Sequence, residues 1–453
     1  MKKTLITTVA LLIAVVSQAN TIIVNNTNDS GAGSLRQASI DANSGDTIRF
    51  NPNLLTAAVD SISLVSQIDF GTKGIVIKGL YSDTDTLFIS GGNSSGIFKF
   101  QGAGNVVLDS LVLINGVWDN GGAVLYNDGD SLHIVNSVVS GNSASNNGGG
   151  IYAYNSSVTI SHSTISNNKG NFSGGGIYAY DSPVTVSHST ISGNSTDATG
   201  GGILTLNSNV TINHSTISGN SAGNAGGGIY TYSEWIPLSM TVRNSTISGN
   251  SAVSGVGGLY TSANFSTLSL SIGSSIVTDN TYIFPGPSFS SDGYNIFSDA
   301  PFGVIETDQT NVTAAQLNLG PLQQNGGTTR TMLPKSGSVA IDLGNPTDMS
   351  DAQNRAVSGG RRDVGSAETT TTGINENSLS KISIYPNPTT ASLIIENKTH
   401  TINAISILDT KGRVIKTAAK NTKTIDVANM PKGIYFLQIH TDSGLVNKKF
   451  IKE

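Results

Sequence analysis

Residues 148–168 read Gly148-Gly-Gly-Ile-Tyr-Ala-Tyr-Asn-Ser-Ser-Val-Thr-Ile-Ser-His-Ser-Thr-Ile-Ser-Asn-Asn168, and close copies of this stretch recur every 26 residues. Repetition at such a period is typical of solenoids, in which each unit buries its apolar side against its neighbours. The phrase Gly-Gly-Gly-Ile ends at Ile151, Ile177, Ile203 and Ile229. One asparagine closes each unit, at Asn142, Asn168, Asn194 and Asn220, and after the spacing stretches to 30 residues at Asn250 and Asn280.

The apolar pattern inside one unit has a period of two, which predicts strands and not helices. Ile151 and Ala153 share one face of a short run, Val158 and Ile160 share one face of the next, and Ile165 heads a third. Glycine triplets and Ser/Asn/Gly clusters separate these runs, as turns do. The sequence therefore predicts an all-β fold, a right-handed parallel β-helix with three short strands per coil. We expect the isoleucines to fill its core and the asparagine amides to bond from coil to coil.

Such a helix exposes strand edges and an open core at each end, so the fold requires caps. The segment Ser34-Leu-Arg-Gln-Ala-Ser-Ile-Asp-Ala-Asn43 is predicted to be the first of these. Ser34 and Gln37 have the spacing of a capping box. Leu35, Ala38 and Ile40 are expected to cover the first coil.

The two ends of this region contain sequence motifs that resemble those of a known class of proteins. Asn25-Asn-Thr-Asn-Asp-Ser-Gly-Ala-Gly-Ser-Leu-Arg-Gln-Ala38, Leu319-Gly-Pro-Leu-Gln-Gln-Asn-Gly-Gly327 and Arg361-Arg-Asp-Val-Gly-Ser-Ala-Glu368 resemble the entry and closing motifs of exported β-helix proteins of the choice-of-anchor Q class. The resemblance implies a β-helix with its cap over residues 20–305, with strong repeats at about 121–280. A closing region is expected over residues 306–368.

The start of the chain has the form of a secretory signal over residues 1–19. Lys2 and Lys3 precede a short apolar run, and Ser17-Gln-Ala19 offers a small-residue cleavage site. The apolar run is too short to span a bilayer, and no other segment reads as transmembrane. Cysteine is absent, which excludes disulfides and thiolate metal sites. These features predict a soluble, exported protein.

Charge is distributed unevenly along the chain. Residues 20–380 hold 12 Lys/Arg and 25 Asp/Glu, whereas residues 381–453 hold 11 and 5. An acidic body argues against nucleic acid as a partner, because binding phosphates requires a basic surface. The regular coils are nearly free of charge, so their surface is rich in Ser, Thr, Asn and Gly.

A polar linker over residues 369–380 precedes a tail, residues 381–453, with a different character. Its alternating strands predict a compact antiparallel Ig-like β-sandwich. Tyr385-Pro-Asn-Pro388, Lys432-Gly-Ile-Tyr435 and the ending Lys448-Lys-Phe-Ile-Lys-Glu453 resemble the type A C-terminal sorting domain of the type IX secretion system. The resemblance implies export across the outer membrane by that machinery, removal of the tail and attachment to surface glycolipid. The protein is therefore expected to be secreted, and to be extracellular or anchored to the outer-membrane surface. An ordinary Ig-like binding module is the alternative.

Parallel β-helices also host polysaccharide lyases and glycoside hydrolases, so catalysis is an open alternative. Both chemistries require clustered carboxylates, and the regular coils carry few. A site would have to use acidic residues of the irregular parts, such as Asp83, Asp85, Asp109, Asp119, Asp128 and Asp130. Asn127-Asp-Gly-Asp130 has oxygen ligands suited to calcium, although such a string is more often a turn. We predict no catalytic residue and no cofactor, with calcium kept as a possibility.

Histidines recur in one column, at His162, His188 and His214. Imidazoles one coil apart suggest a metal site. Asn136, Asn244 and Ser274 occupy the same column in flanking coils, which favours a hydrogen-bonding turn position.

The tyrosines indicate a function more strongly than the acidic residues or the histidines do. If Ile151 and Ala153 point inward, the alternating tyrosines point outward in two columns, interrupted by Leu204 and Leu206. Aromatic rows rimmed by hydroxyl groups suit the apolar faces of sugar rings, although stacked tyrosines could also simply protect an exposed sheet. We therefore predict a non-catalytic glycan-binding or adhesive protein, with a structural spacer as a further alternative. The predicted ligand-binding residues are Tyr152, Tyr154, Tyr178, Tyr180, Tyr230, Tyr232 and Tyr260.

Overall fold

The computed structural model describes residues 19–453 apart from 57–59, 82–85, 280, 284–287, 348–360, 370–381, 398–400, 410–412, 421 and 442–443. The chain divides into two compact units, residues 1–369 and 370–453. The predicted secretory signal and polar linker lie outside the described residues, except for Ala19 and Thr369.

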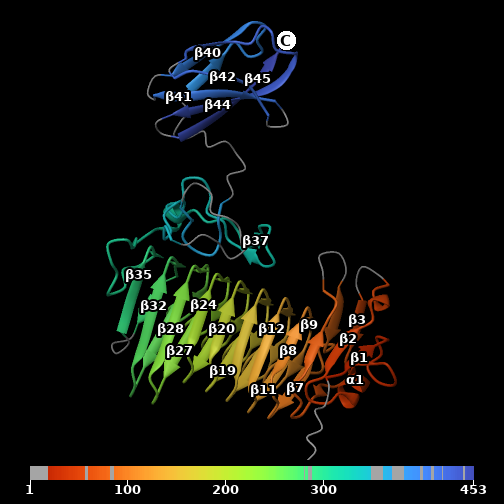
Figure 1. Cartoon of the computed structure of the whole chain (residues 1–453). Helices are drawn as coiled ribbons and strands as arrows, with labels where there is room; N and C mark the ends of the chain where they lie inside the picture. Colours follow the sequence, from red (N-terminus) through yellow and green to blue (C-terminus); the bar gives the residue numbers. More distant parts are fainter. Residues whose placement is uncertain are drawn as a thin grey trace, which may run out of the picture. The chain divides into compact units, whose positions relative to one another are not determined.

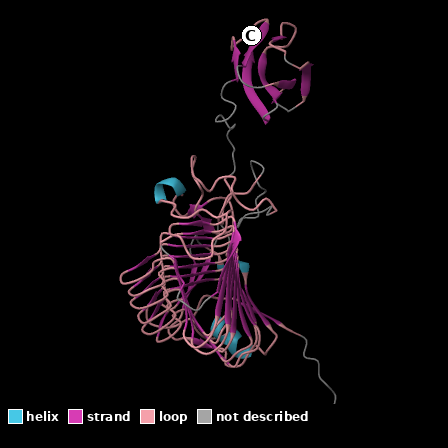
Figure 2. Cartoon of the chain, turned by 90° about the vertical axis from the view of Figure 1, so that its left-hand side faces the viewer, coloured by secondary structure: helices cyan, strands magenta, loops and turns pink. Residues whose placement is uncertain are grey.

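The larger unit is a parallel β-helix whose coils add strands to four sheets, and the strands of successive coils overlie one another (Figures 1 and 2). Sheet 1 contains β4 (Ile68–Asp69), β7 (Phe98–Gln101), β11 (Val124–Asn127), β15 (Ile151–Tyr154), β19 (Ile177–Tyr180), β23 (Ile203–Leu206), β27 (Ile229–Ser233), β31 (Leu259–Ala263) and β34 (Thr281–Ile283). Sheet 2 contains β1 (Thr21–Val24), β2 (Thr47–Phe50), β5 (Val76–Lys78), β8 (Val106–Asp109), β12 (Ser131–Val135), β16 (Ser157–Ser161), β20 (Val184–Ser187), β24 (Val210–Asn213), β28 (Leu238–Arg243), β32 (Leu268–Gly273) and β35 (Ser288–Gly293).

The other two sheets follow in each coil. Sheet 3 contains β3 (Asp60–Ser63), β6 (Leu87–Ser90), β9 (Val112–Ile114), β13 (Val138–Ser140), β17 (Thr164–Ser166), β21 (Thr190–Ser192), β25 (Thr216–Ser218), β29 (Thr246–Ser248), β33 (Ile276–Val277) and β36 (Ile296–Phe297). Sheet 4 contains β10 (Val117–Trp118), β14 (Ser143–Ala144), β18 (Lys169–Gly170), β22 (Ser195–Thr196), β26 (Ser221–Ala222) and β30 (Ser251–Ala252).

The predicted parallel β-helix is confirmed, but three strands per coil is too few for the repeated coils. Ile151 and Ile177 are paired in register and fully buried, as the repeat predicts. The additional strand is the two-residue strand of sheet 4, such as β18. Its sequence, Lys169-Gly170, has no apolar alternation, so the pattern of apolar residues gives no sign of it.

Each coil turns at residues with positive φ, which few side chains tolerate. In the coil that starts at Ile151 these are Asn155, His162, Asn167 and Gly174, with φ between 47° and 65°. The glycine after Gly174 is needed for a different reason. A Cβ on Gly175 would lie 2.4 Å from the Ser195 carbonyl oxygen and 2.5 Å from that of Gly201, so the neighbouring coil leaves no space for a side chain.

Polar ladders run inside the helix, and the two longest are formed by asparagine and by serine side chains. The asparagine side chains bond from coil to coil, as predicted, from Asn142 to Asn250. At the next position the backbone N–H of Asn250 donates to the carboxylate of Asp279. The predicted last member, Asn280, lies outside the described residues. A serine ladder, not predicted, runs beside the asparagine ladder: the backbone N–H of each serine donates to the hydroxyl of the next. Its members are Ser137, Ser163, Ser189, Ser215, Ser245 and Ser275.

Helix α1 (Leu35–Asp41) covers the first coil, as predicted. Ser34 caps it by accepting from the Gln37 backbone N–H at 3.1 Å, and Leu35 and Ala38 are buried in the core. Ile40 was expected to join them, but it lies on the solvent side and is 64 % exposed. Gln37 donates to Asp41, so the second half of the capping box is replaced.

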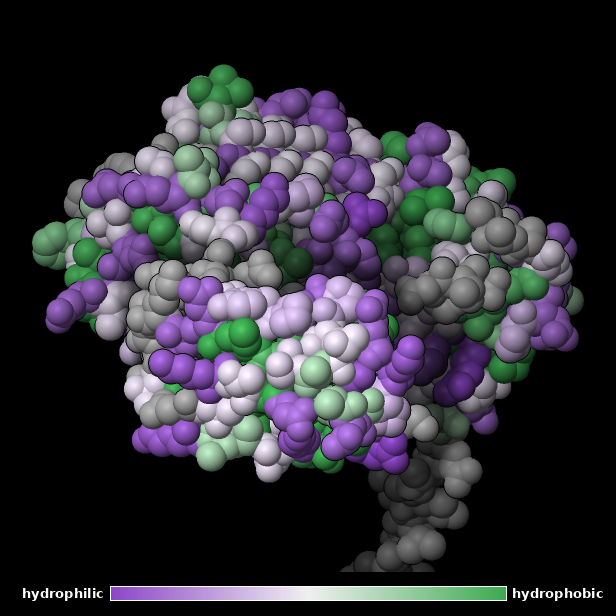
Figure 3. Space-filling view, turned by 90° about the horizontal axis from the view of Figure 1, so that it is seen from above, coloured by the Kyte–Doolittle hydropathy of each residue, from purple (hydrophilic) through white to green (hydrophobic). Residues whose placement is uncertain are grey.

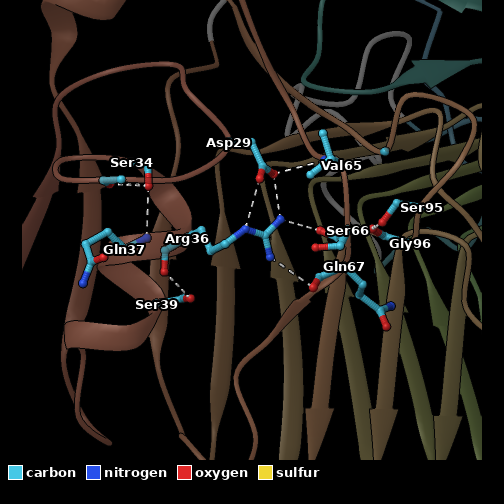
Figure 4. A network of polar contacts seen from close by, with 12 residues as sticks. Asp29, Ser34, Arg36, Gln37, Ser39, Val65, Ser66, Gln67, Ser95 and Gly96 are labelled. Carbon is cyan, nitrogen blue, oxygen red and sulfur yellow. Dashed lines mark hydrogen bonds and ion pairs between the residues drawn. The ribbon is translucent and has the colours of Figure 1, made fainter.

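Arg36 ties this helix to the coils that follow it (Figure 4). Its guanidinium lies 2.7 Å from Asp29 and donates to the backbone carbonyls of Ser66 and Gln67. Asp29 in turn accepts from the backbone N–H of Val65. A single ion pair therefore joins the entry loop, the cap and the next coil. The segment before β3 also contains the short 3₁₀ helix η1 (Pro52–Leu54).

The segment after the last coil lies along the outer face of sheet 3. It contains α2 (Ala314–Leu317) and the hairpin of β37 (Gln323–Gln324) and β38 (Arg330–Thr331). The Ser366 backbone N–H donates to the Thr246 hydroxyl at 3.0 Å, and Thr190 donates to the Arg330 carbonyl. We call residues 306–347 together with 361–368 the closing segment.

The smaller unit has two antiparallel sheets around one apolar core. The first contains β39 (Ile382–Tyr385), β40 (Ser392–Asn397) and β43 (Thr424–Asp426). The second contains β41 (Ile402–Leu408), β42 (Val414–Ala418), β44 (Gly433–Thr441) and β45 (Gly444–Lys452). Ile382, Leu393, Ile405, Leu437 and Phe450 pack in the core they share. The antiparallel strands are confirmed, and an Ig-like topology stays a prediction. Of the described helices, none has the length and apolar character to span a bilayer.

Candidate functional site

The seven predicted tyrosines lie on the outer face of sheet 1, in two columns set by the strand register. The first column runs Tyr152, Tyr178, Leu204, Tyr230, Tyr260, and the second runs Tyr154, Tyr180, Leu206, Tyr232, Ser262. We call these seven tyrosines, with the two leucines between them, the tyrosine strip. The residues between them, such as Ile151 and Ala153, are fully buried, so the alternation of the strand sends the rings outward.

The rings of the strip stack face to face. Tyr152 and Tyr178 have centroids 5.1 Å apart and planes within 3°, and Tyr230 and Tyr260 are 4.7 Å apart and within 2°. In the second column Tyr154 and Tyr180 are 5.5 Å apart. Stacking half-buries most of these rings, while Tyr154 remains 39 % exposed. The strip is therefore less exposed than the sequence suggests, because each ring covers the next.

Burial raises the pKa of three phenols of the strip, those of Tyr152, Tyr178 and Tyr230. It raises the pKa of Tyr178 to about 12, with neighbouring Tyr152 and Tyr180 adding to the effect. It likewise raises the pKa of Tyr230 to about 12, with Tyr260 and Tyr232 contributing. At neutral pH these hydroxyl groups are uncharged and able both to donate and to accept hydrogen bonds.

A groove of about 330 Å³ opens where the leucines interrupt the columns. Tyr178, Leu204, Leu206, Tyr230 and Tyr232 line it from the strip. Asn147, Phe172, Ser173 and Thr199 line it from the turns that lead into sheet 1. This volume is at the small end of ligand pockets. The groove combines aromatic and aliphatic surface with a rim of hydroxyl and amide groups.

Exposed aromatic rings flank the strip at both edges of sheet 1, and the sequence reasoning missed them. Phe172 precedes the sheet and is 63 % exposed. Trp235 and Phe265 follow it, stacked at 4.7 Å although each is about two-thirds exposed. The sequence does indicate these rings, because the repeat lengthens from 26 to 30 residues in this region. Trp235 and Phe265 are 30 residues apart and lie in matching loops.

Of the acidic residues considered for catalysis, Asp109, Asp119 and Asp128 lie at different turns and each is bonded to neighbouring side chains. Asp109 pairs with Lys78 at 3.1 Å. Burial alone would raise the pKa of Asp109, but hydrogen bonds from Lys78, Ser110 and Asn136 outweigh it and leave the pKa lowered. Asp119 accepts from Ser145 at 2.9 Å. Asp83 and Asp85 lie outside the described residues.

The string Asn127-Asp-Gly-Asp130 forms the turn from sheet 1 to sheet 2. Asp128 has φ of 50° and accepts from Gln101 on one side and Asn155 on the other, so its carboxylate bridges three coils. Within the described parts of the chain, no group of three or more His, Asp or Glu side chains is placed to hold a metal ion. Calcium at this turn stays a prediction.

The three histidines form a stack at the turn from sheet 2 to sheet 3. Their centroids are 4.9 Å apart and their planes within 5°. The lone pairs of parallel rings run side by side and do not converge on one ion, whereas metal ligands must converge. Asn244 bonds His214 at 3.1 Å, which agrees with a hydrogen-bonding turn position.

A second cavity, of about 730 Å³, lies between sheet 3 and the closing segment. Ser140, Ser166, Ser192 and Ser218 line it from the coils, and Arg330 lines it from the hairpin. On the face seen in Figure 3, hydrophilic and near-neutral residues predominate and apolar residues form small separate patches. This cavity lacks the stacked rings that distinguish the tyrosine strip.

Comparison with known proteins identifies the two parts of the chain. Residues 383–453 match the family model of a secretion system C-terminal sorting domain. The protein is secreted. The match confirms the predicted type IX sorting tail, and with it the secretion machinery as a partner and a location at the cell surface or outside the cell. Residues 114–272 match the model of a right handed beta helix region, which confirms the predicted hand of the coil.

The comparisons with curated proteins and with solved structures do not identify an activity. No curated protein matches the chain. Among solved structures, the chain is similar to that described as "Crystal structure of pectate lyase Pel9A", with 13 % identity and a TM-score of 0.36 over 78 % of this chain and 97 % of the other. A likeness at that score carries no argument about activity.

Proposed function

We propose that this secreted β-helix binds glycans at the tyrosine strip, without catalysis, and so serves in adhesion or surface attachment. The observation that carries the proposal is the parallel stacking of Tyr152 on Tyr178 and of Tyr230 on Tyr260 beside an open groove. The C–H groups of a sugar ring are attracted to the electron-rich faces of such rings. The uncharged hydroxyl groups around them hydrogen-bond the sugar's own hydroxyls.

The positions, the hydrogen bonds and the pKa of the acidic residues support binding over catalysis. A lyase or hydrolase requires two carboxylates, or a carboxylate cluster with a metal, around one bond. Asp109, Asp119 and Asp128 belong to different turns and each bonds to neighbouring side chains. A lowered pKa also makes Asp109 a poor proton donor near neutral pH.

The ends of the β-helix agree with a surface location. The motifs at residues 25–38 and 361–368 resemble those of the choice-of-anchor Q class, which carries interchangeable C-terminal anchors. In the proposal, the sorting tail is removed after export and the β-helix is attached to surface glycolipid, so that the strip is displayed outside the cell.

The test is a glycan array probed with the full chain, followed by titration of the best ligand against the double variant Tyr178→Ala/Tyr230→Ala. Losing two ring contacts worth about 0.5–1.5 kcal/mol each should weaken binding about tenfold or more. Phe302→Ala is the matched control, because it removes a ring that is 96 % exposed and outside the strip. Binding that survives the double variant would move the ligand elsewhere, for instance to the cavity under the closing segment.

An activity assay on the same glycans separates binding from catalysis. We expect neither new reducing ends nor unsaturated products. Turnover that disappears in Asp109→Asn or Asp128→Asn would refute the non-catalytic proposal.

A further inference from the structure

A pocket of about 340 Å³ lies beside β4 and β7, at the first coils of sheet 1. Asp69 and Lys99 line it from these two strands, and Trp118 lines it from β10 of sheet 4. The segments that precede β4 and β7 complete the lining with Val65, Ser66, Gln67, Ser94 and Ser95. None of these residues belongs to the tyrosine strip, so the pocket is a separate candidate site.

The strand register places this pocket in line with the first column of the tyrosine strip. Asp69 is paired with Lys99. Lys99 is paired with Leu125, which in turn is paired with Tyr152. Both neighbours of Lys99 in β7 are fully buried, so the alternation of the strand directs Lys99 outward. Two strand spacings, about 9.6 Å, separate Lys99 from Tyr152, and the pocket and the strip share one outer face.

Trp118 reaches the pocket because the coil before it leaves room. Its strand, β10, is the edge strand of sheet 4, and Gly96 lies beside it in the preceding coil. A Cβ on Gly96 would lie 3.2 Å from the Cβ of Trp118 and 2.5 Å from the amide nitrogen of Gln67. The indole is 42 % exposed, so part of its surface is open to a ligand.

Hydrogen bonds to the backbone fix one wall of the pocket (Figure 4). Arg36 donates to the carbonyls of Ser66 and Gln67, and Asp29 accepts from the N–H of Val65. The wall is therefore formed before any ligand arrives, which reduces the entropy that binding costs.

The two charged groups of the pocket neutralise each other. Lys99 Nζ lies 2.8 Å from Asp69 Oδ2, and the two side chains remain 35 % and 50 % exposed. Burial alone would raise the pKa of Asp69, but hydrogen bonds from Lys99 and from the Gly71 N–H outweigh it and leave the pKa lowered. A charged ligand would meet no net charge here. A neutral ligand with hydroxyl groups can donate to the carboxylate and accept from the ammonium group.

We propose that this pocket binds one pyranose ring of a neutral glycan, with the apolar face of the ring on Trp118 and two adjacent hydroxyls on Asp69 and Lys99. The inference goes beyond the function proposed above, which places a glycan on the tyrosine strip. The C–H groups of the ring are attracted to the electron-rich indole face. Its hydroxyls make charge-assisted hydrogen bonds, which are stronger than those between neutral groups. The volume of the pocket is at the small end for ligands, as a single ring requires.

The test uses the fluorescence of Trp118. The chain has two tryptophans, and Trp235→Phe removes the other one while keeping a ring to stack on Phe265. This full-length variant is titrated with the methyl glycosides of glucose, galactose and mannose. At least one should change the fluorescence saturably, with a Kd of about 0.1–10 mM. No saturation with any of the three up to about 100 mM would overturn the inference.

Substitutions in the same background assign the signal to the pocket. Asp69→Asn should weaken binding of the glycoside by about fivefold or more, because a neutral acceptor replaces a charged one. Asp119→Asn is the matched control, since Asp119 follows Trp118 in the chain but lies outside the residues that line the pocket. The control should bind within about twofold of the parent. Unchanged affinity in Asp69→Asn would overturn the inference.

Calorimetry tests the indole itself in the otherwise unchanged chain. Trp118→Ala should weaken binding of the same glycoside by about tenfold or more, and Trp118→Phe should lose less because it keeps an aromatic face. Full affinity in Trp118→Ala would overturn the inference. If Trp118→Ala fails to fold, Asp69→Asn decides. Tighter binding of N-acetyl-tyrosine amide than of every glycoside would assign the pocket to aromatic side chains of a protein partner and would also overturn it.

The outcomes separate this inference from the proposed function. If no glycan binds the tyrosine strip but a glycoside still saturates the Trp118 signal, the proposed function fails and the pocket stands. If a glycan binds and is lost in Tyr178→Ala/Tyr230→Ala while no glycoside changes the Trp118 signal, the pocket fails and the proposed function stands.

Discussion

The side-chain amide of Asn168 and its backbone N–H both donate to the same oxygen, Oδ1 of Asn194, at 2.9 and 3.0 Å. The remaining amide hydrogen of Asn168 is directed to the Val139 carbonyl in the preceding coil. Each asparagine thus satisfies buried groups of three coils, and both residues are fully buried. The asparagine ladder therefore runs through the buried interior of the β-helix and not along its surface.

Replacing one member should destabilise the whole helix. Asn194→Ala leaves the Asn168 amide and backbone N–H without their acceptor in a buried place, which costs about 1–3 kcal/mol for each group. We expect a loss of about 2–6 kcal/mol in the free energy of unfolding, measured by urea denaturation. Asn167→Gly is the control, because Asn167 is exposed and the matching residues in the next coils are Gly193 and Gly219. A control that destabilises as much as Asn194→Ala would contradict the ladder's role.

The closing segment should be released from sheet 3 by one hydroxyl substitution. Thr246→Val removes the acceptor of the buried Ser366 N–H, at a cost of about 1–3 kcal/mol. Limited proteolysis should then cut the closing segment faster than in the wild type. Thr164→Val is the matched control, since Thr164 belongs to the same column of sheet 3 but is only half-buried. Equal cleavage of the wild type and Thr246→Val would show that this contact does not hold the segment.

The raised pKa of Tyr178 predicts a loss of stability at high pH. Its folded-state pKa is about 12, against about 10 in the unfolded chain, so between these values the unfolded chain releases its proton first. The folded state therefore loses stability as pH rises from about 10 to 12. Tyr178→Phe has no proton to release, so its urea midpoint should fall less between pH 9 and pH 11.5. Parallel pH profiles for the two proteins would be evidence against a buried phenol.

The repeat itself was readable from the sequence because its physical causes are local. The burial of Ile151 and Ile177 and the bonding of Asn168 to Asn194 follow once positions 26 apart are stacked. The outward tyrosines follow from the same register. The prediction that Ile40 is buried was wrong for a local reason as well. In a helix of only seven residues the buried face is narrow, so residues that follow one another in the sequence can lie on different sides of its boundary.

Features outside the repeat were not readable in this way. Ser366 reaches Thr246 across 120 residues of chain, and no periodicity encodes such a contact. The stack of Trp235 on Phe265 depends on how two loops of irregular length fold. The groove beside the tyrosine strip is lined partly by Phe172 and Thr199 from the turns, and the repeat pattern does not place these side chains. Which ligand enters it depends on side-chain geometry that the repeat alone does not specify.

Because Asn168, Asn194 and Asn220 make interchangeable bonds, a coil is a modular length of chain. Removing 26 residues from within the identical stretch would bring equivalent partners together again, and the rod would shorten by about 4.8 Å with its interior intact. Duplication would lengthen it by the same step. A gain or loss of one unit would therefore change the number of stacked tyrosines on the outer face of sheet 1 while the architecture stayed the same.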